Sequence, residues 1–250
     1  MAQFKNSQDS HNHSLELLSL IYGYDSFLDN LSSIADMGCG DGLDAEWWAT
    51  VETQDEPPEP RNFKVYAVDR NIRRIDPDTL KFNRNIAAIQ GNFEDRVVPV
   101  KVDLIWAHDS FQYAIDPIKC LTSWKDTLNT NGMLMLAIPQ TTYLNKNALV
   151  VENTNQLHNY NVLNLMYMLA LVGFDVNDAY FYRKENTPWL YAAVYATDRA
   201  PLPITTTWTE LAELNLVNSS VRDSINRYNY PKLNEVVVTW LDKSFYQLKS

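Results

Sequence analysis

The sequence is poor in glycine, cysteine and positive charge. Its 250 residues include 7 glycines and 2 cysteines, and 21 Lys and Arg against 31 Asp and Glu give a formal net charge of −10. Cys39 and Cys120 are too few for a disulfide framework and have no CxxC spacing, so we expect two reduced thiols and no metal site. The acidic balance disfavours a broad phosphate-neutralising surface, and with it nonspecific nucleic-acid binding, but it suits a cationic ligand.

Long apolar runs are also missing. No stretch is long enough to cross a bilayer, and the first residues lack the charged-then-apolar layout of a signal peptide. We therefore expect a cytoplasmic protein with no membrane partner. A hydrophobic content of 46% is enough for one sizeable domain with an elaboration.

Short apolar stretches typical of strands alternate with helical stretches over the first 140 residues. The expected strands are 34–37, 63–69, 86–91, 101–107 and 133–138. The expected helices are 44–51, with Asp44 as N-cap, a short helix before residue 86, and 116–128; residues 73–78 and 129–132 are expected turns. Such alternation predicts a doubly wound, parallel sheet.

The second half of the chain predicts an antiparallel edge and a helical end. Residues 161–172 read as a buried helix that ends at Gly173, and two candidate strands, 178–183 and 189–196, flank hairpin-like residues. Helices are expected at 207–216 and 232–246. The predicted fold is therefore α/β, with a doubly wound seven-stranded, mostly parallel sheet whose last strand is reversed. We divide the chain into an N-terminal helical segment (1–30), a main domain (31–197) and a helical C-terminal extension (198–250).

Three of the seven glycines, Gly38, Gly40 and Gly42, lie within five positions after the first strand. Their clustering marks a tight turn that a ligand can approach closely. A dinucleotide-binding fingerprint would place its third glycine where this chain has Leu43.

The GxGxG spacing, with Asp36 before it and Asp69 closing the next strand, resembles the class I S-adenosylmethionine-dependent methyltransferases. Segments 89–95, 102–109, 131–137 and 173–174 resemble further landmarks of that family in the same order, so the resemblance covers about residues 30–197. It implies an enzyme that uses S-adenosyl-L-methionine as methyl donor and forms S-adenosyl-L-homocysteine.

The resemblance also implies a set of cofactor-binding residues. Asp36 would receive the ammonium of the methionine moiety, and Asp69 would accept hydrogen bonds from the ribose hydroxyls. Asn92 and Phe93 would meet the adenine, with Arg70 beside the nucleoside. The remaining members are Gly38, Cys39, Gly40, Gly42 and Trp106. Alternatives stay open: Asp69 as a turn residue, Asp36 as a cap, and Phe93 as core.

Polar and aromatic residues follow the fourth strand, at the edge where open parallel sheets bind ligands. His108 is the first candidate for a proton acceptor, with Asp109 beside it. The candidate acceptor-binding residues are Gln112, Tyr113, Tyr143 and His158. The alternative is that His108 only orders its loop and that some of the others only pack.

Two motifs of base-methylating enzymes are missing, an Asp/Asn-Pro-Pro-aromatic run after the fourth strand and a Pro-Cys nucleophile, since Lys119 precedes Cys120. We therefore expect methylation of an N or O atom of a small molecule. One alternative is a binding or structural protein that keeps the fold and uses its aromatic C-terminal region as an interface, for example in a homo-oligomer. A further alternative is a protein methyltransferase.

Overall fold

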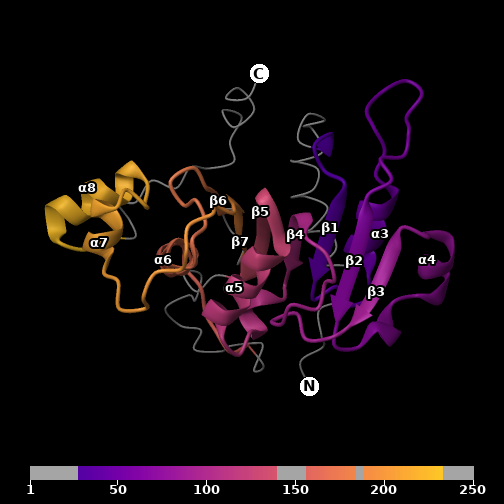
Figure 1. Ribbon diagram of the computed structural model, residues 1–250, viewed down its shortest axis with the longest axis horizontal. Coiled ribbons are helices and arrows are strands. Elements are labelled where there is room, and N and C mark those ends of the chain that lie inside the picture. The colour runs from indigo at the N-terminus through magenta and orange to yellow at the C-terminus, as the bar shows by residue number, and fades with distance from the viewer. Residues whose placement is uncertain (1–27, 140–155, 184–188, 233–250) are drawn as a thin grey trace, which may run out of the picture.

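A computed structural model describes residues 28–139, 156–183 and 189–232 of the chain. It contains one seven-stranded sheet with the strand order β3-β2-β1-β4-β5-β7-β6. Figure 1 shows the sheet along the long axis of the molecule, with α4 beyond β3 at one end and α7 and α8 at the other. Tyr143, the residues before 28, the turn before Trp189 and most of the expected helix 232–246 lie outside the described residues.

The strands confirm the expected sheet. Their bounds are β1 (Ser33–Met37), β2 (Lys64–Asp69), β3 (Ile86–Gln90), β4 (Val102–His108), β5 (Leu128–Pro139), β6 (Tyr180–Arg183) and β7 (Trp189–Tyr195). The first five strands are parallel, whereas β7 runs antiparallel to both β5 and β6. The carboxyl ends of β1 to β4 therefore meet at one edge of the sheet.

The helices are α3 (Leu43–Thr50), α4 (Pro77–Phe82), α5 (Pro117–Thr127), α6 (Val162–Val172), α7 (Trp208–Glu213) and α8 (Ser219–Tyr228). Two short 3₁₀ turns, η1 (Ile72–Arg74) and η2 (Phe111–Tyr113), complete the elements. Asp116 caps α5 by accepting from the Lys119 N–H, and Asn161 forms a capping box on α6. Gly173, at φ 101°, ends α6 as expected.

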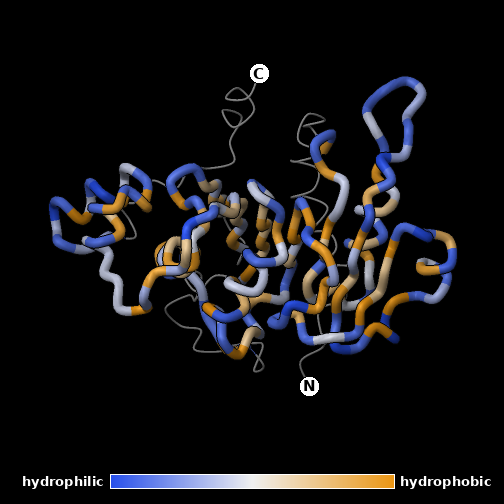
Figure 2. Tube along the Cα trace, viewed as in Figure 1, coloured by the Kyte–Doolittle hydropathy of each residue, from blue (hydrophilic) through white to orange (hydrophobic). Residues whose placement is uncertain are grey.

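The sheet separates two apolar clusters. On one face, Trp124 of α5 packs with Phe111, and its indole N–H donates to the Phe93 carbonyl at 2.7 Å. On the other face, Trp48 of α3 packs with Phe63 and other residues of the second cluster. Figure 2 shows the hydrophobic residues gathered along the central strands and the hydrophilic ones along the outer loops.

The C-terminal helices share the first of these clusters. Leu211 of α7 and Val221 and Ile225 of α8 are buried in the same cluster as Trp124. The sequence analysis missed α8 because only two of its ten residues, spaced four apart, are apolar and buried.

Two cationic side chains donate hydrogen bonds to backbone carbonyls at the carboxyl end of α6. Carbonyls in the last turn of a helix lack partners within the helix. Lys125 donates to the Val172 carbonyl at 3.2 Å and to the Arg199 carbonyl. Arg199 Nη2 donates to the carbonyls of Ala170 at 2.6 Å and Phe174 at 3.3 Å. The segment after β7 is thereby tied to α5 and α6.

Three local predictions were wrong. The N-cap of α3 is Gly42 rather than Asp44, because the left-handed turn at Gly42 (φ 85°) starts the helix one residue earlier. Residues 73–78 are not one turn but the end of η1 and the start of α4. β5 begins at Leu128, and a register shift against β4 accommodates the expected turn 129–132, where Asn131 has φ 62°.

Candidate active site

The three clustered glycines form a loop between β1 and α3, and all have positive φ angles of 85°, 58° and 85°. A Cβ on Gly38 would lie 2.4 Å from the Ser110 Cβ, and one on Gly42 would lie 3.0 Å from a methyl carbon of Ile75. For Gly40, the nearest atom in the described part of the chain is the Arg74 Nη2, at 3.8 Å. Packing among the described residues thus explains Gly38 and Gly42, whereas a Cβ on Gly40 would make only an ordinary contact with Arg74.

Asp69, at the end of β2, holds this loop. Its Oδ2 accepts from the Gly40 N–H at 3.1 Å, and its Oδ1 accepts from the Asn71 N–H at 2.8 Å. A carboxylate can accept about four hydrogen bonds, so both oxygens retain capacity for further donors. The side chain is half-buried and lies directly beside Gly40.

Asp36 lies on β1 beneath the same loop and is 2% exposed. The Ala45 N–H hydrogen-bonds to its carboxyl group, but Oδ2 has no hydrogen-bond partner among the described residues. Burial raises the pKa of Asp36 well above its usual range, and the nearby carboxylates of Asp44 and Asp69 raise it further. A buried oxygen of this kind is costly unless a donor from outside the chain satisfies it.

Asp44, Trp106 and His108 form a polar cluster next to Asp36. The Trp106 indole N–H donates to Asp44 Oδ2 at 2.9 Å, and His108 Nδ1 lies 3.3 Å from the same oxygen. The His108 ring also lies 5.3 Å from the Trp189 ring, centroid to centroid. The sequence analysis did not place Asp44 in this cluster because no spacing rule connects a helix's first turn to a strand residue 62 positions later.

Asn92 and Phe93 follow β3. Just before them, the Gly91 N–H donates to the Asp69 carbonyl at 3.0 Å, which holds the end of β3 beside the end of β2. Asn92 Oδ1 accepts from Arg70 Nη2 at 3.2 Å, so these two predicted residues are in contact. Phe93 is 7% exposed, and its ring packs 6.1 Å from that of Trp124. Its position at the edge of the core, near Gly38, leaves little of the ring for a ligand.

The loop after β4 is held by its own side chains. Asp109 has a φ of 50°, its N–H donates to the Ala137 carbonyl, and its Oδ1 accepts from Gln112 Nε2 at 2.5 Å. The Gln112 carbonyl accepts from the Leu157 and His158 N–H groups, which brings His158 to this loop. Tyr113 is half-buried in the same turn.

Trp106 and Gln112 are two predicted site residues with buried side chains. Both side chains are 0% exposed. Trp106 lies under α3 with its ring 5.9 Å from that of Trp48, and Gln112 is turned inward toward Asp109. Alternation along β4 turns the Trp106 ring into the core, and its predicted part in cofactor binding stays a prediction.

Both cysteines are free and buried, as expected. Burial raises the pKa of both thiols, so Cys39 remains a neutral thiol within the glycine loop. Across the described ranges, no group of three or more His, Cys, Asp or Glu side chains is placed to hold a metal ion. None of the described helices is long and apolar enough to cross a membrane.

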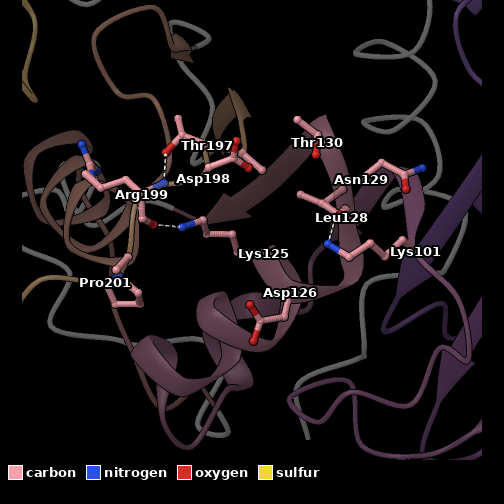
Figure 3. Close-up of a pocket in the computed structure, with 12 residues that line it drawn as sticks. Lys101, Lys125, Asp126, Leu128, Asn129, Thr130, Thr197, Asp198, Arg199 and Pro201 are labelled. Carbon is pink, nitrogen blue, oxygen red and sulfur yellow. Dashed lines mark hydrogen bonds between the residues drawn. The ribbon is translucent and has the colours of Figure 1, made fainter.

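A cavity of about 250 Å³ lies elsewhere, between the start of β5 and the segment after β7. Figure 3 shows Lys101, Lys125 and Arg199 around it, with Lys101 donating to the Leu128 carbonyl. This is the amino edge of β5, opposite the edge that carries the glycine loop. The sheet edge with Asp36, Gly40, Asp69 and His108 is therefore the candidate active site.

Residues 35–136 match the model of a methyltransferase domain family. An S-adenosylmethionine-dependent methyltransferase from Clostridium acetobutylicum ATCC 824 has a similar structure, with a TM-score of 0.53 and 15% identity over 72% of this chain and 90% of that one. No curated protein sequence matches the chain.

Two further structures share the fold. One is Burkholderia thailandensis 1,6-didemethyltoxoflavin-N1-methyltransferase with bound 1,6-didemethyltoxoflavin and S-adenosylhomocysteine; its TM-score is 0.52, with 13% identity over 79% of this chain and 93% of that one. The other is the CurJ carbon methyltransferase, with a TM-score of 0.51 and 12% identity over 67% of this chain and only 49% of that one.

Residues 35–136 match a methyltransferase domain, and the chain has the Rossmann-like fold shared with S-adenosylmethionine-dependent methyltransferases of known structure.

Proposed function

We propose that the enzyme methylates an N or O atom of a small molecule. The observation that carries the proposal is the place of His108, at the carboxyl end of β4, with Asp44 against its Nδ1 and the glycine loop nearby. One enzyme with a similar structure is named as an N1-methyltransferase of 1,6-didemethyltoxoflavin.

The residues around the glycine loop fit the cofactor. Oδ2 of Asp36, which has no partner within the described residues, suits the methionine ammonium. Asp69 retains acceptor capacity for the ribose hydroxyls of S-adenosylmethionine, and the lack of a side chain at Gly40 would let this ligand approach the backbone. We assign Asn92 and Arg70, which contact each other, to the adenine side of the site.

The bound cofactor supplies an electrophilic methyl group on a sulfonium. The protein's contribution is then mainly alignment, which in well-oriented systems is worth about 7 to 11 kcal/mol. We assign His108 the proton that an N–H or O–H acceptor loses when it gains the methyl group. Asp109 and Gln112 hold the loop that carries this site, and His158 and Tyr113 border it.

Calorimetry with S-adenosylmethionine and S-adenosylhomocysteine tests the cofactor part of the proposal. Asp69→Asn should weaken binding at least about 5-fold, equivalent to about 1 kcal/mol, because it loses charge-assisted bonds to the ribose. Asp78→Asn, an exposed acid in the first turn of α4, is the matched control and should bind as the wild type does. No binding by the wild type at millimolar ligand would refute the proposal.

Transfer of a labelled methyl group to fractionated small-molecule and protein extracts tests the acceptor. Label in the small-molecule fraction, lost in His108→Gln, is the expected result. Label confined to protein would instead favour a protein methyltransferase. A cytoplasmic location and association through the C-terminal helices stay predictions of the sequence; Trp208 in that region packs on Tyr167, with ring centroids 5.3 Å apart.

A further inference from the structure

Glu94 is a buried acid in the segment that follows β3, one residue beyond Phe93. Its side chain is only 4% exposed, and a carboxylate enclosed to this degree needs donors close to it. The backbone of the segment is anchored to the core, since the Trp124 indole N–H donates to the Phe93 carbonyl at 2.7 Å. The donors that reach Glu94 therefore show which parts of the protein this anchored segment joins.

Two of the donors are backbone groups at the start of α5. Glu94 Oε2 accepts from the Ile115 N–H at 2.9 Å and from the Asp116 N–H at 3.1 Å. Asp116 is the N-cap of α5, and Ile115 lies between this helix and η2, which carries Gln112 and Tyr113. A carboxylate also suits the amino end of a helix electrostatically. Glu94 thus holds one end of the loop after β4, where the candidate acceptor-binding residues lie.

The third donor is Arg70, which follows Asp69 at the end of β2. Arg70 Nη2 lies 3.2 Å from Asn92 Oδ1 and 3.5 Å from Glu94 Oε1. The Arg70 side chain is 59% exposed, so this long ion pair contributes little in the ligand-free protein. A ligand that covers Arg70 and Asn92 removes water from the pair and strengthens its attraction. One oxygen of Glu94 therefore faces the nucleoside side of the site, and the other holds the loop after β4.

We propose that Glu94 is a positioning residue that couples the cofactor's nucleoside to the loop after β4. The inference rests on the proposed function, in which Asn92 and Arg70 lie on the adenine side of the site. Binding of the nucleoside strengthens the pair of Arg70 and Glu94, so that the carboxylate moves less and its bonds to the backbone open less often. The methyl acceptor then meets an ordered loop when the methyl donor is in place.

Amide hydrogen exchange at Ile115 and Asp116 measures this coupling, because a bonded N–H exchanges through opening of its hydrogen bond. Exchange rates are measured by NMR on ¹⁵N-labelled protein, without ligand and with saturating S-adenosylhomocysteine. In the wild type, we expect the ligand to slow both rates at least about 5-fold. In Glu94→Gln the amide oxygen can still accept from the backbone, but the neutral side chain loses its attraction to Arg70, so most of the slowing should be lost.

Asp95→Asn is the matched control. Asp95 is the next residue, and its exposed carboxylate pairs with Lys119 of α5 at 2.8 Å. The variant therefore removes an acid that joins the same two segments without touching the link to Arg70. It should keep the slowing seen in the wild type.

Two results would overturn the proposal: a wild type that binds S-adenosylhomocysteine with no slowing at Ile115 and Asp116, or a slowing in Glu94→Gln as large as in the wild type. The first needs no variant to fold. The second would show a purely structural role, because such a role changes the rates with and without ligand by the same factor. Calorimetry on the same samples separates the two claims. No binding by the wild type refutes the proposed function, whereas binding without slowing refutes only the role of Glu94.

Discussion

Replacing Asp36 by Asn should make the ligand-free protein more stable and the cofactor weaker in binding. In the free protein, Oδ2 is enclosed without a partner among the described residues, and burial raises the pKa of this carboxyl group. Such a group costs about 1–3 kcal/mol, and we take about 1–2 kcal/mol because the Ala45 N–H remains. For a protein of this size the gain corresponds to a rise in Tm of roughly 2–8 °C.

The gain should depend on pH in a defined direction. Since the folded-state pKa of Asp36 is raised, the folded protein holds this proton to higher pH than the unfolded chain does. The wild type therefore loses stability as pH rises above the ordinary carboxyl pKa of about 4, and the advantage of the Asp36→Asn variant should shrink as pH is lowered toward that value.

Thermal unfolding of the wild type and Asp36→Asn, from about pH 4 upward, measures the gain in stability. Calorimetric titration with the cofactor measures the loss of binding affinity. Loss of the charge-assisted bond to the ammonium should cost about 1.5–3 kcal/mol, or about 10- to 150-fold in Kd. A less stable variant, or one with unchanged affinity, would show that Asp36 is a structural residue and that the ammonium binds elsewhere.

Three further predictions concern the loop and the end of α6. Binding of the cofactor's ammonium should ionise Asp36 and release its proton, so cofactor affinity should rise with pH through the raised pKa of Asp36. Calorimetric titrations in buffers of different ionisation enthalpy count the released protons, and a net uptake of protons would contradict the prediction. In urea unfolding, Gly38→Ala should lower the free energy of unfolding by about 2–4 kcal/mol, because its Cβ meets Ser110 in a left-handed turn. Gly40→Ala should lower it by only about 1–2 kcal/mol and should mainly weaken cofactor binding. Equal stabilities of the two variants would refute the distinction. Arg199→Met should cost about 1–3 kcal/mol by leaving α6 carbonyls without donors, and an unchanged urea midpoint would show that water replaces them.

The sheet and the glycine loop could be predicted because they depend on local patterns. Alternating strands and helices, three glycines and two acids at strand ends are visible without any contact information. The contacts of Asp44 could not be predicted in this way, since they depend on α3 starting at Leu43 and on the indole of Trp106 meeting its carboxylate. Likewise, Gln112 has the composition of a substrate-binding residue, but the turn after β4 directs its side chain inward.

The cations at the end of α6 also bear on how the chain unfolds. Lys125 lies inside the predicted main domain and Arg199 just beyond its predicted end at residue 197, yet they satisfy one set of carbonyls. Leu211 and Ile225, further along, are buried in the same cluster as Trp124. Because these contacts cross the predicted boundary, melting residues 198–232 would uncover α6. We expect both parts to unfold in a single cooperative transition, rather than the extension alone.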